Sequence, residues 1–179
     1  MLPVVQRKLG EVKRRRINRA PSPTLAIALP WVLVMLGSLN PTWPLIASLP
    51  LLPPLGFLVL VAWQQMRPGL FPVWAGLPLG LFDDLYSGQP FGSGVLLWSL
   101  AAIGLDYVET RFPWRGFVQN WVLAAVVTVA YLALAALIAG GNLALLGPQL
   151  LLSVLLYPLI GHVVGLIDRL RLFPFRAIG

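Results

Sequence analysis

The residues best suited to chemistry are two adjacent carboxylates, Asp83 and Asp84, which lie in an otherwise apolar stretch of the chain. Ionisable side chains in apolar surroundings are costly, so each one is a functional candidate. This pair could form a proton relay, a cation site or a general acid/base pair. Neighbouring residues on a helix point about 100° apart. We therefore expect the two carboxylates to face different surroundings.

Turn-forming residues surround this pair and favour a structural interpretation. Gly80 precedes the carboxylates, and Gly88, Pro90 and Gly92 follow them. Such residues are typical of a helix that ends in a tight turn. A carboxylate at this break in the chain would bond the backbone or side chains of the next helix. The polar side chains expected at similar depth are Ser87, Gln89, Asn142 and Gln149.

The other ionisable groups also favour structural roles. Four of them predict an ion-pair cluster that anchors a helix end at the membrane surface: Asp106, Glu109, Arg111 and Arg115. His162 lies between Gly161 and Gly165, and a single His among small residues more often makes a hydrogen bond between helices than binds a ligand. Gly161 with Gly165, and Gly76 with Gly80, form GxxxG motifs, which permit close helix packing.

No set of residues in the sequence matches the site of an enzyme. The chain has no cysteine and a single histidine, which excludes disulfides, thiol chemistry, Cys-based metal centres and sites with several histidines. There is no nucleophile–base arrangement, metal-ligand spacing or phosphate-binding loop. We therefore expect no catalytic residue, no metal and no cofactor.

Composition indicates a membrane protein with a single domain. The chain has 179 residues, of which 11% are charged and 58% are hydrophobic, and its mean hydropathy is +0.83. A soluble domain usually has about 25% charged residues. These values exclude a disordered chain and argue against an ordinary soluble domain.

Six apolar stretches predict six membrane spans. They cover approximately residues 24–43, 47–65, 70–86, 91–109, 116–139 and 143–167. The second and third contain or adjoin several prolines, which mark kinks in membrane helices and are tolerated where neighbours satisfy the freed carbonyls. The expected fold is an all-α membrane protein, a compact bundle of six transmembrane helices. The first span is not followed by a small-residue cleavage site, so we expect a retained anchor rather than a signal peptide.

The charge distribution predicts the orientation of the bundle. With the N-terminus in the cytoplasm, all thirteen Lys and Arg residues lie on the cytoplasmic side, as the positive-inside rule requires. The expected parts are a basic cytoplasmic N-terminal tail (1–23), the six-span domain (24–168) and a cytoplasmic C-terminal tail (169–179). We expect tryptophans near the membrane edges: Trp31, Trp43, Trp63, Trp98, Trp114 and Trp121.

The N-terminal tail has two interpretations. Val5, Leu9 and Val12 recur at helical spacing among basic residues, which fits a helix lying on the inner leaflet of the bilayer. The alternative is an untethered tail that only sets the topology. Because the tail directly precedes an apolar run, anionic lipid is a better partner for it than nucleic acid.

The run Gly80-x-x-x-Asp84-x-x-x-Gly88-x-Pro90-x-Gly92, together with the length and the short loops, resembles the bacterial rod shape-determining protein MreD family. The resemblance places Asp84 at the acidic position of that family and the three glycines and Pro90 at its turn positions. Asp83 is an additional acidic residue, so it could also occupy the acidic position.

The resemblance implies a non-enzymatic inner-membrane scaffold of the cell-elongation complex, which organises peptidoglycan synthesis. The implied partners are an MreC-type bitopic membrane protein, an MreB-type actin-like filament, and a SEDS glycosyltransferase with its transpeptidase. A homodimer is left open. The helices of that family are similar in arrangement to the substrate-binding subunits of energy-coupling-factor transporters. The alternative function is therefore a solute-binding subunit of a vitamin-type transporter, with a pocket lined by Asp83, Asp84, Gln89 and Gln149.

Overall fold

Six α-helices form the part of the chain that the computed structural model describes, which comprises residues 23–42, 52–112, 116–141, 143 and 146–172. The helices are α1 (Pro23–Ser38), α2 (Leu55–Met66), α3 (Gly76–Ser87), α4 (Ser93–Arg111), α5 (Phe117–Ile138) and α6 (Leu146–Leu172). Short 3-10 turns, η1 (Asn40–Thr42) and η2 (Val73–Ala75), flank α1 and α3. No strand occurs within these ranges. The expected tail helix with Val5, Leu9 and Val12 lies outside them.

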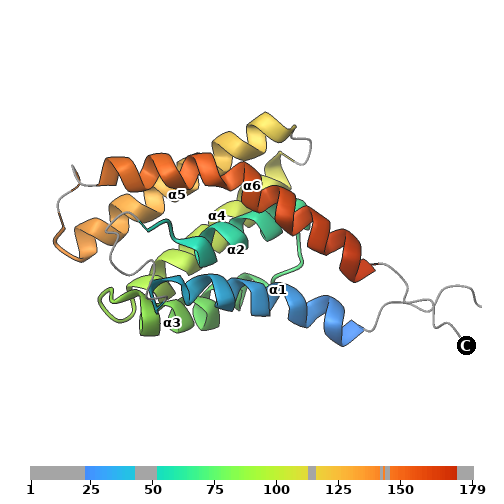
Figure 1. Cartoon of the computed structure of the whole chain (residues 1–179), viewed down its shortest axis with the longest axis horizontal. Helices are drawn as coiled ribbons and strands as arrows, with labels where there is room; N and C mark the ends of the chain where they lie inside the picture. The colour runs from blue at the N-terminus through green and yellow to red at the C-terminus, as the bar shows by residue number, and fades with distance from the viewer. Residues whose placement is uncertain (1–22, 43–51, 113–115, 142, 144–145, 173–179) are drawn as a thin grey trace, which may run out of the picture.

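Successive helices run in opposite directions, so the beginning of α1 and the end of α6 lie at the same end of the bundle (Figure 1). Helices α2, α4 and α6 end there. We call this the Arg end, because their last turns, or the residue directly after them, carry Arg67, Arg111, Arg169 and Arg171. The opposite end carries the α3–α4 turn, and we call it the turn end. α6 extends four residues beyond Asp168, so Arg169 and Arg171 belong to its last turn.

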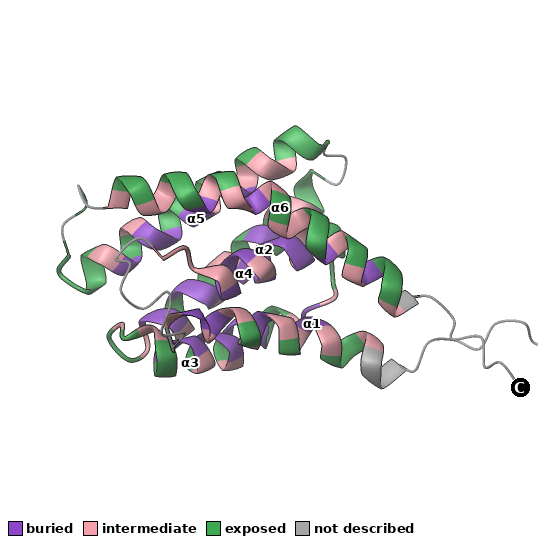
Figure 2. Cartoon of the chain, viewed as in Figure 1, coloured by how far each residue is buried: buried purple, intermediate pink, exposed green. Residues whose placement is uncertain are grey.

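Helix α2 forms the centre of the bundle. It packs against α1, α4, α5 and α6, and its residues from Gly56 to Trp63 are mostly buried, as Figure 2 shows. A helix that is apolar on all sides is expected to be buried rather than to face solvent. In contrast, α5 and α6 leave many of their apolar side chains exposed (Figure 2).

Two of the tryptophans expected near the membrane edges are buried in the core. Trp63 and Trp98 have no exposed surface, and the ring of Trp98 packs edge-to-face on Phe57 with a centroid distance of 5.8 Å. Residue spacing predicts the depth of a side chain along a helix but not whether it faces the core, so the depth of these two residues in a membrane stays a prediction. Trp43 and Trp114 lie outside the described residues.

Prolines inside two helices release backbone carbonyls, and side chains from other helices bond them. Pro158 in α6 has no N–H to offer the Val154 carbonyl, and the Trp121 indole N–H of α5 donates to that oxygen at 3.0 Å. Pro30 in α1 leaves the Ala26 carbonyl free in the same way, and the Arg171 guanidinium donates to it. Each proline thus fixes a contact between two helices.

The helices differ greatly in length. α5 and α6 are long and apolar enough to cross a membrane. α2 and α3 have 12 residues each, about 18 Å of helix, which is shorter than a hydrocarbon core of about 30 Å. The second expected span is shortened because Pro53 and Pro54 stand immediately before the start of α2 at Leu55. The third is divided into η2 and α3.

Candidate functional site

Asp84, near the end of α3, caps the start of α4. Its carboxylate accepts hydrogen bonds from the backbone N–H groups of Gly92 at 2.8 Å, Gly94 at 2.7 Å and Val95 at 3.3 Å. The first N–H groups of a helix have no partner within the helix, and the helix dipole favours a negative charge there. The carboxylate therefore supplies the cap that Gly92, at the N-cap position, cannot supply itself.

The residues between Asp84 and α4 form the turn that makes this capping possible. Gly88 ends α3 with φ +70°, and Gly92 precedes α4 with φ +93°, a left-handed conformation that residues with a Cβ adopt at a cost. The Pro90 carbonyl accepts bonds from the backbone N–H and the hydroxyl of Ser93, at 3.0 and 2.7 Å. The chain therefore reverses within a few residues and returns to Asp84.

Glycines allow α3 and α4 to approach closely beside this turn. A Cβ on Gly80 would lie 2.5 Å from the Gly94 carbonyl oxygen, and a Cβ on Gly94 would lie 2.5 Å from the Asp84 carboxylate. Gly76, one helical turn before Gly80, lies equally close to the backbone of Ser99. The GxxxG motif of α3 thus packs against α4 within the same chain.

Asp83 faces a different environment from its neighbour. Its side chain lines a cavity of about 270 Å³ at the turn end, which we call the outer cavity. The outer cavity receives residues from α1, η1, α2, α3, α5 and α6 but not from α4. Its polar lining residues are Ser38, Asn40, Asp83, Ser87, Gln89, Tyr131 and Gln149.

The outer cavity contains three of the four residues expected to line a solute pocket, namely Asp83, Gln89 and Gln149. Asp84 is not among its lining residues, since it is directed at α4. Sequence spacing did not identify Ser38, Asn40 or Tyr131, because these residues reach the cavity through tertiary packing. Asn142, also expected at this depth, lies outside the described residues.

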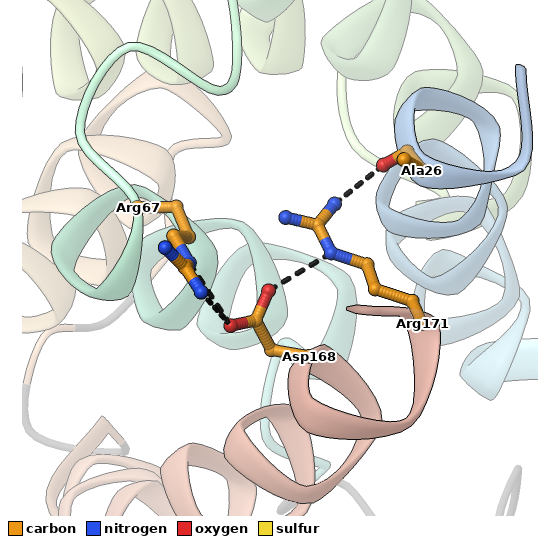
Figure 3. Close-up of polar contacts among 4 residues, drawn as sticks. All are labelled: Ala26, Arg67, Asp168 and Arg171. Atoms are coloured by element: carbon orange, nitrogen blue, oxygen red, sulfur yellow. Dashed lines mark hydrogen bonds and ion pairs between the residues drawn. The ribbon is translucent and has the colours of Figure 1, made fainter. Parts of the chain in front are cut away.

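A second polar cluster lies at the Arg end (Figure 3). The Asp168 carboxylate pairs with Arg67 at 2.8 Å and with Arg171 at 2.9 Å. The side chains of Asp168 and Arg171 are each 7% exposed, whereas that of Arg67 is 47% exposed. Arg171 also donates to the Ala26 carbonyl and lies 4.9 Å from the centre of the Trp63 ring. The cluster joins α1, α2 and α6, and its composition was not predicted from the sequence.

His162 does not make the expected hydrogen bond to another helix within the described part of the chain. It is exposed on α6 and lines a groove of about 460 Å³ between α2, α5 and α6, which we call the α6 groove. Gly161 and Gly165 line the same groove. A Cβ on Gly161 would meet no other described atom within 4 Å, so this GxxxG motif is only partly covered by the chain itself.

The expected cluster of Asp106, Glu109, Arg111 and Arg115 is described only in part. Arg115 lies outside the described residues. Asp106 and Glu109 lie beside Gln64 and Gln65 of α2 around a small hollow at the Arg end. Arg111 is exposed at the end of α4. The buried ion pairs of the described chain involve Asp168 instead.

Comparisons of the chain with protein-family models, curated proteins and solved structures found no match. Within the described ranges, no group of three or more His, Asp or Glu side chains could hold a metal ion. Two features of this arrangement are suited to binding another molecule. The outer cavity offers a carboxylate and neutral polar groups, and the α6 groove offers small residues on an uncovered helix face.

Proposed function

We propose that the chain is a multi-pass protein of the bacterial inner membrane, related to the MreD family, that acts as a non-enzymatic scaffold. All six helices pass through the membrane region, with both termini in the cytoplasm. In this role the bundle docks the transmembrane helix of an MreC-type bitopic protein. It thereby organises the MreB-type filament and the SEDS glycosyltransferase with its transpeptidase for peptidoglycan synthesis along the cell axis.

The position of the basic residues supports the proposed orientation in the membrane. The described basic residues lie at one end of the bundle (Figure 1). The chain has no Lys or Arg between Arg19 and Arg67, between Arg67 and Arg111, or between Arg115 and Arg169. Because cytoplasmic loops are enriched in basic residues, the Arg end faces the cytoplasm in this proposal. The helices too short to span alone pack against longer ones, α2 against α6 and α3 against α4.

The observation that carries the scaffold role is the uncovered Gly161 on α6. The glycines of the other GxxxG motif lie against the backbone of α4, whereas Gly161 faces the open α6 groove. Helices in membranes associate through small residues that let their backbones approach. A groove with an uncovered glycine and exposed apolar neighbours therefore suits a single helix from another protein.

The experiment replaces Gly161 by Leu and measures partner recovery. The tagged chain is co-expressed with the MreC-type protein of the same organism and purified in mild detergent. We expect Gly161→Leu to lower partner recovery at least ten-fold at an unchanged level of the chain. The matched control is Gly104→Leu, because a Cβ on the exposed Gly104 of α4, like one on Gly161, would meet no described atom within 4 Å. Equal recovery with wild type and Gly161→Leu would exclude this groove as the docking site.

A second candidate function is a solute-binding subunit of a vitamin-type transporter, which the outer cavity favours. Asp83, Gln89 and Gln149 line it together at the turn end, where a solute outside the cell would enter. Binding sites of this kind combine apolar walls with a few placed polar groups. Saturable thermal stabilisation of the purified protein by one member of a vitamin panel would favour this function, and a flat response across the panel would count against it.

A further inference from the structure

The outer cavity has an unbalanced set of polar groups. Asp83 is the only charged residue in its lining, and the side chain is almost fully enclosed, with 8% of the residue exposed. The nearest basic residues in the sequence on either side of this region, Arg67 and Arg111, close helices at the Arg end. The described lining thus places a carboxylate opposite no cation.

Two amide side chains of the outer cavity donate to backbone carbonyls. The Asn40 amide N–H donates to the Pro53 carbonyl at 2.9 Å, and the Gln149 amide N–H donates to the Leu52 carbonyl at 2.6 Å. The Asn40 Oδ1 is buried and has no hydrogen-bond partner among the described residues, whereas the Ser38 hydroxyl lies within hydrogen-bonding reach of the Asp83 carboxylate. Those two residues are 4% and 3% exposed.

Unpartnered buried polar atoms are costly and uncommon in folded proteins. Here one such atom, Asn40 Oδ1, shares a hollow with the Asp83 carboxylate, and one N–H of each of the two lining amides is already bonded to backbone. The hollow therefore suits a ligand that brings hydrogen-bond donors and positive charge. Tyr131 and Leu132 also line this cavity.

We infer that the outer cavity binds a small organic cation with N–H donors, of the class of a protonated primary amine or a guanidinium. Asp83 pairs with the positive group, and Asn40 Oδ1 accepts a further N–H bond from it. A volume of about 270 Å³ is slightly below the usual range of ligand sites, about 300–1,000 Å³, and suits a molecule smaller than a drug. This inference goes beyond the scaffold role, because the outer cavity and the α6 groove have no lining residue in common.

The first test uses matched charged and uncharged probes. Benzylamine and n-butylamine are compared with benzyl alcohol and n-butanol by thermal shift and calorimetry on the purified full chain. We expect saturable binding of the amines only, weakened at least ten-fold by Asp83→Asn. Asp106→Asn is the control, since Asp106 is an exposed carboxylate near the Arg end. Equal binding of amines and alcohols, no saturable amine binding, or amine binding unchanged by Asp83→Asn would each overturn the inference.

A second test does not require an Asp83 variant to fold. The chain has no cysteine, so Gln89→Cys places a single thiol in the lining of the outer cavity. A cationic trimethylammonium methanethiosulfonate should label this thiol at least ten-fold faster than its anionic sulfonate counterpart, and benzylamine should slow the labelling. Equal rates, or protection by benzyl alcohol as well, would contradict the inference. Partner recovery in the Gly161→Leu experiment is independent of these results, so the two proposals fail separately.

Discussion

The Asp84 carboxylate lies 2.7 Å from the backbone N–H of Gly94, across the turn that joins α3 to α4. The same side chain also bonds Gly92 and Val95. One residue of the preceding helix therefore satisfies most of the free N–H groups at the start of the next. The contact therefore stabilises the start of α4 at Ser93.

Replacing Asp84 by Ala should destabilise the bundle by about 3 kcal/mol, because it leaves several backbone N–H groups without partners. Asp84→Asn should have an intermediate effect, since the amide keeps one acceptor oxygen. The measurement is the midpoint of unfolding by SDS in mixed micelles. Asp106→Ala is the control, because Asp106 is exposed on α4, the helix that Asp84 caps. Equal midpoints for Asp84→Ala and Asp106→Ala would show that the capping bonds contribute nothing.

Gly94→Ala should destabilise the protein by about 1–3 kcal/mol through overpacking. Its new Cβ would lie 2.5 Å from the Asp84 carboxylate and 2.8 Å from the Gly80 carbonyl oxygen. Gly104→Ala on the same helix should be neutral or stabilising, because its Cβ meets no described atom within 4 Å and Ala is the better helix former. The SDS midpoint compares the two variants. A stabilising Gly94→Ala would be incompatible with the close packing of α3 on α4.

Removing one member of the buried pair at the Arg end should cost more than removing both. Asp168→Leu leaves the Arg171 guanidinium buried and uncompensated, at a cost of about 3–5 kcal/mol. The double variant Asp168→Leu, Arg171→Met should recover part of that loss. Arg67→Ala should cost at most about 1 kcal/mol, because its side chain is half exposed and such pairs are weak. The prediction fails if the double variant is less stable than Asp168→Leu.

Trp121→Phe should destabilise the protein by about 1–3 kcal/mol, because the Val154 carbonyl then loses its donor. Pro158→Ala restores a helical N–H to that carbonyl. Trp121→Phe should therefore be less harmful in a Pro158→Ala background than in the wild type. A double-mutant cycle of unfolding free energies measures this coupling. Additive effects would mean that the indole bond and the proline are energetically unrelated.

The proposed topology predicts which single cysteines are accessible in intact cells. Gly141→Cys lies in an exposed turn after α5 at the turn end, and Arg111→Cys lies at the Arg end. A membrane-impermeant maleimide should label Gly141→Cys in intact cells and Arg111→Cys only after permeabilisation. The reverse labelling pattern would show that the bundle has the opposite orientation in the membrane. Labelling of both cysteines in intact cells would contradict six passes.

The amino-acid sequence by itself determined the helical fold class of the protein and the position of the turn between α3 and α4. Apolar runs of helical length predicted an all-helical fold, which the described residues have, and Gly88, Pro90 and Gly92 marked the α3–α4 turn, because the local backbone preferences of Gly and Pro act over a few residues. The helical angle between neighbours was enough to predict that Asp83 and Asp84 face different surroundings.

Only the tertiary structure decided what those surroundings are. Asp168 meets Arg67 across 101 residues of chain, and Ser38 and Tyr131 join Asp83 around the outer cavity. Trp63 and Trp98 proved to be core residues for the same reason. An apolar membrane helix has nearly equal hydropathy on all its faces, so its sequence does not reveal which face meets which neighbour. That choice depends on the fit of side chains and backbones between helices, such as the contact of Gly80 with Gly94.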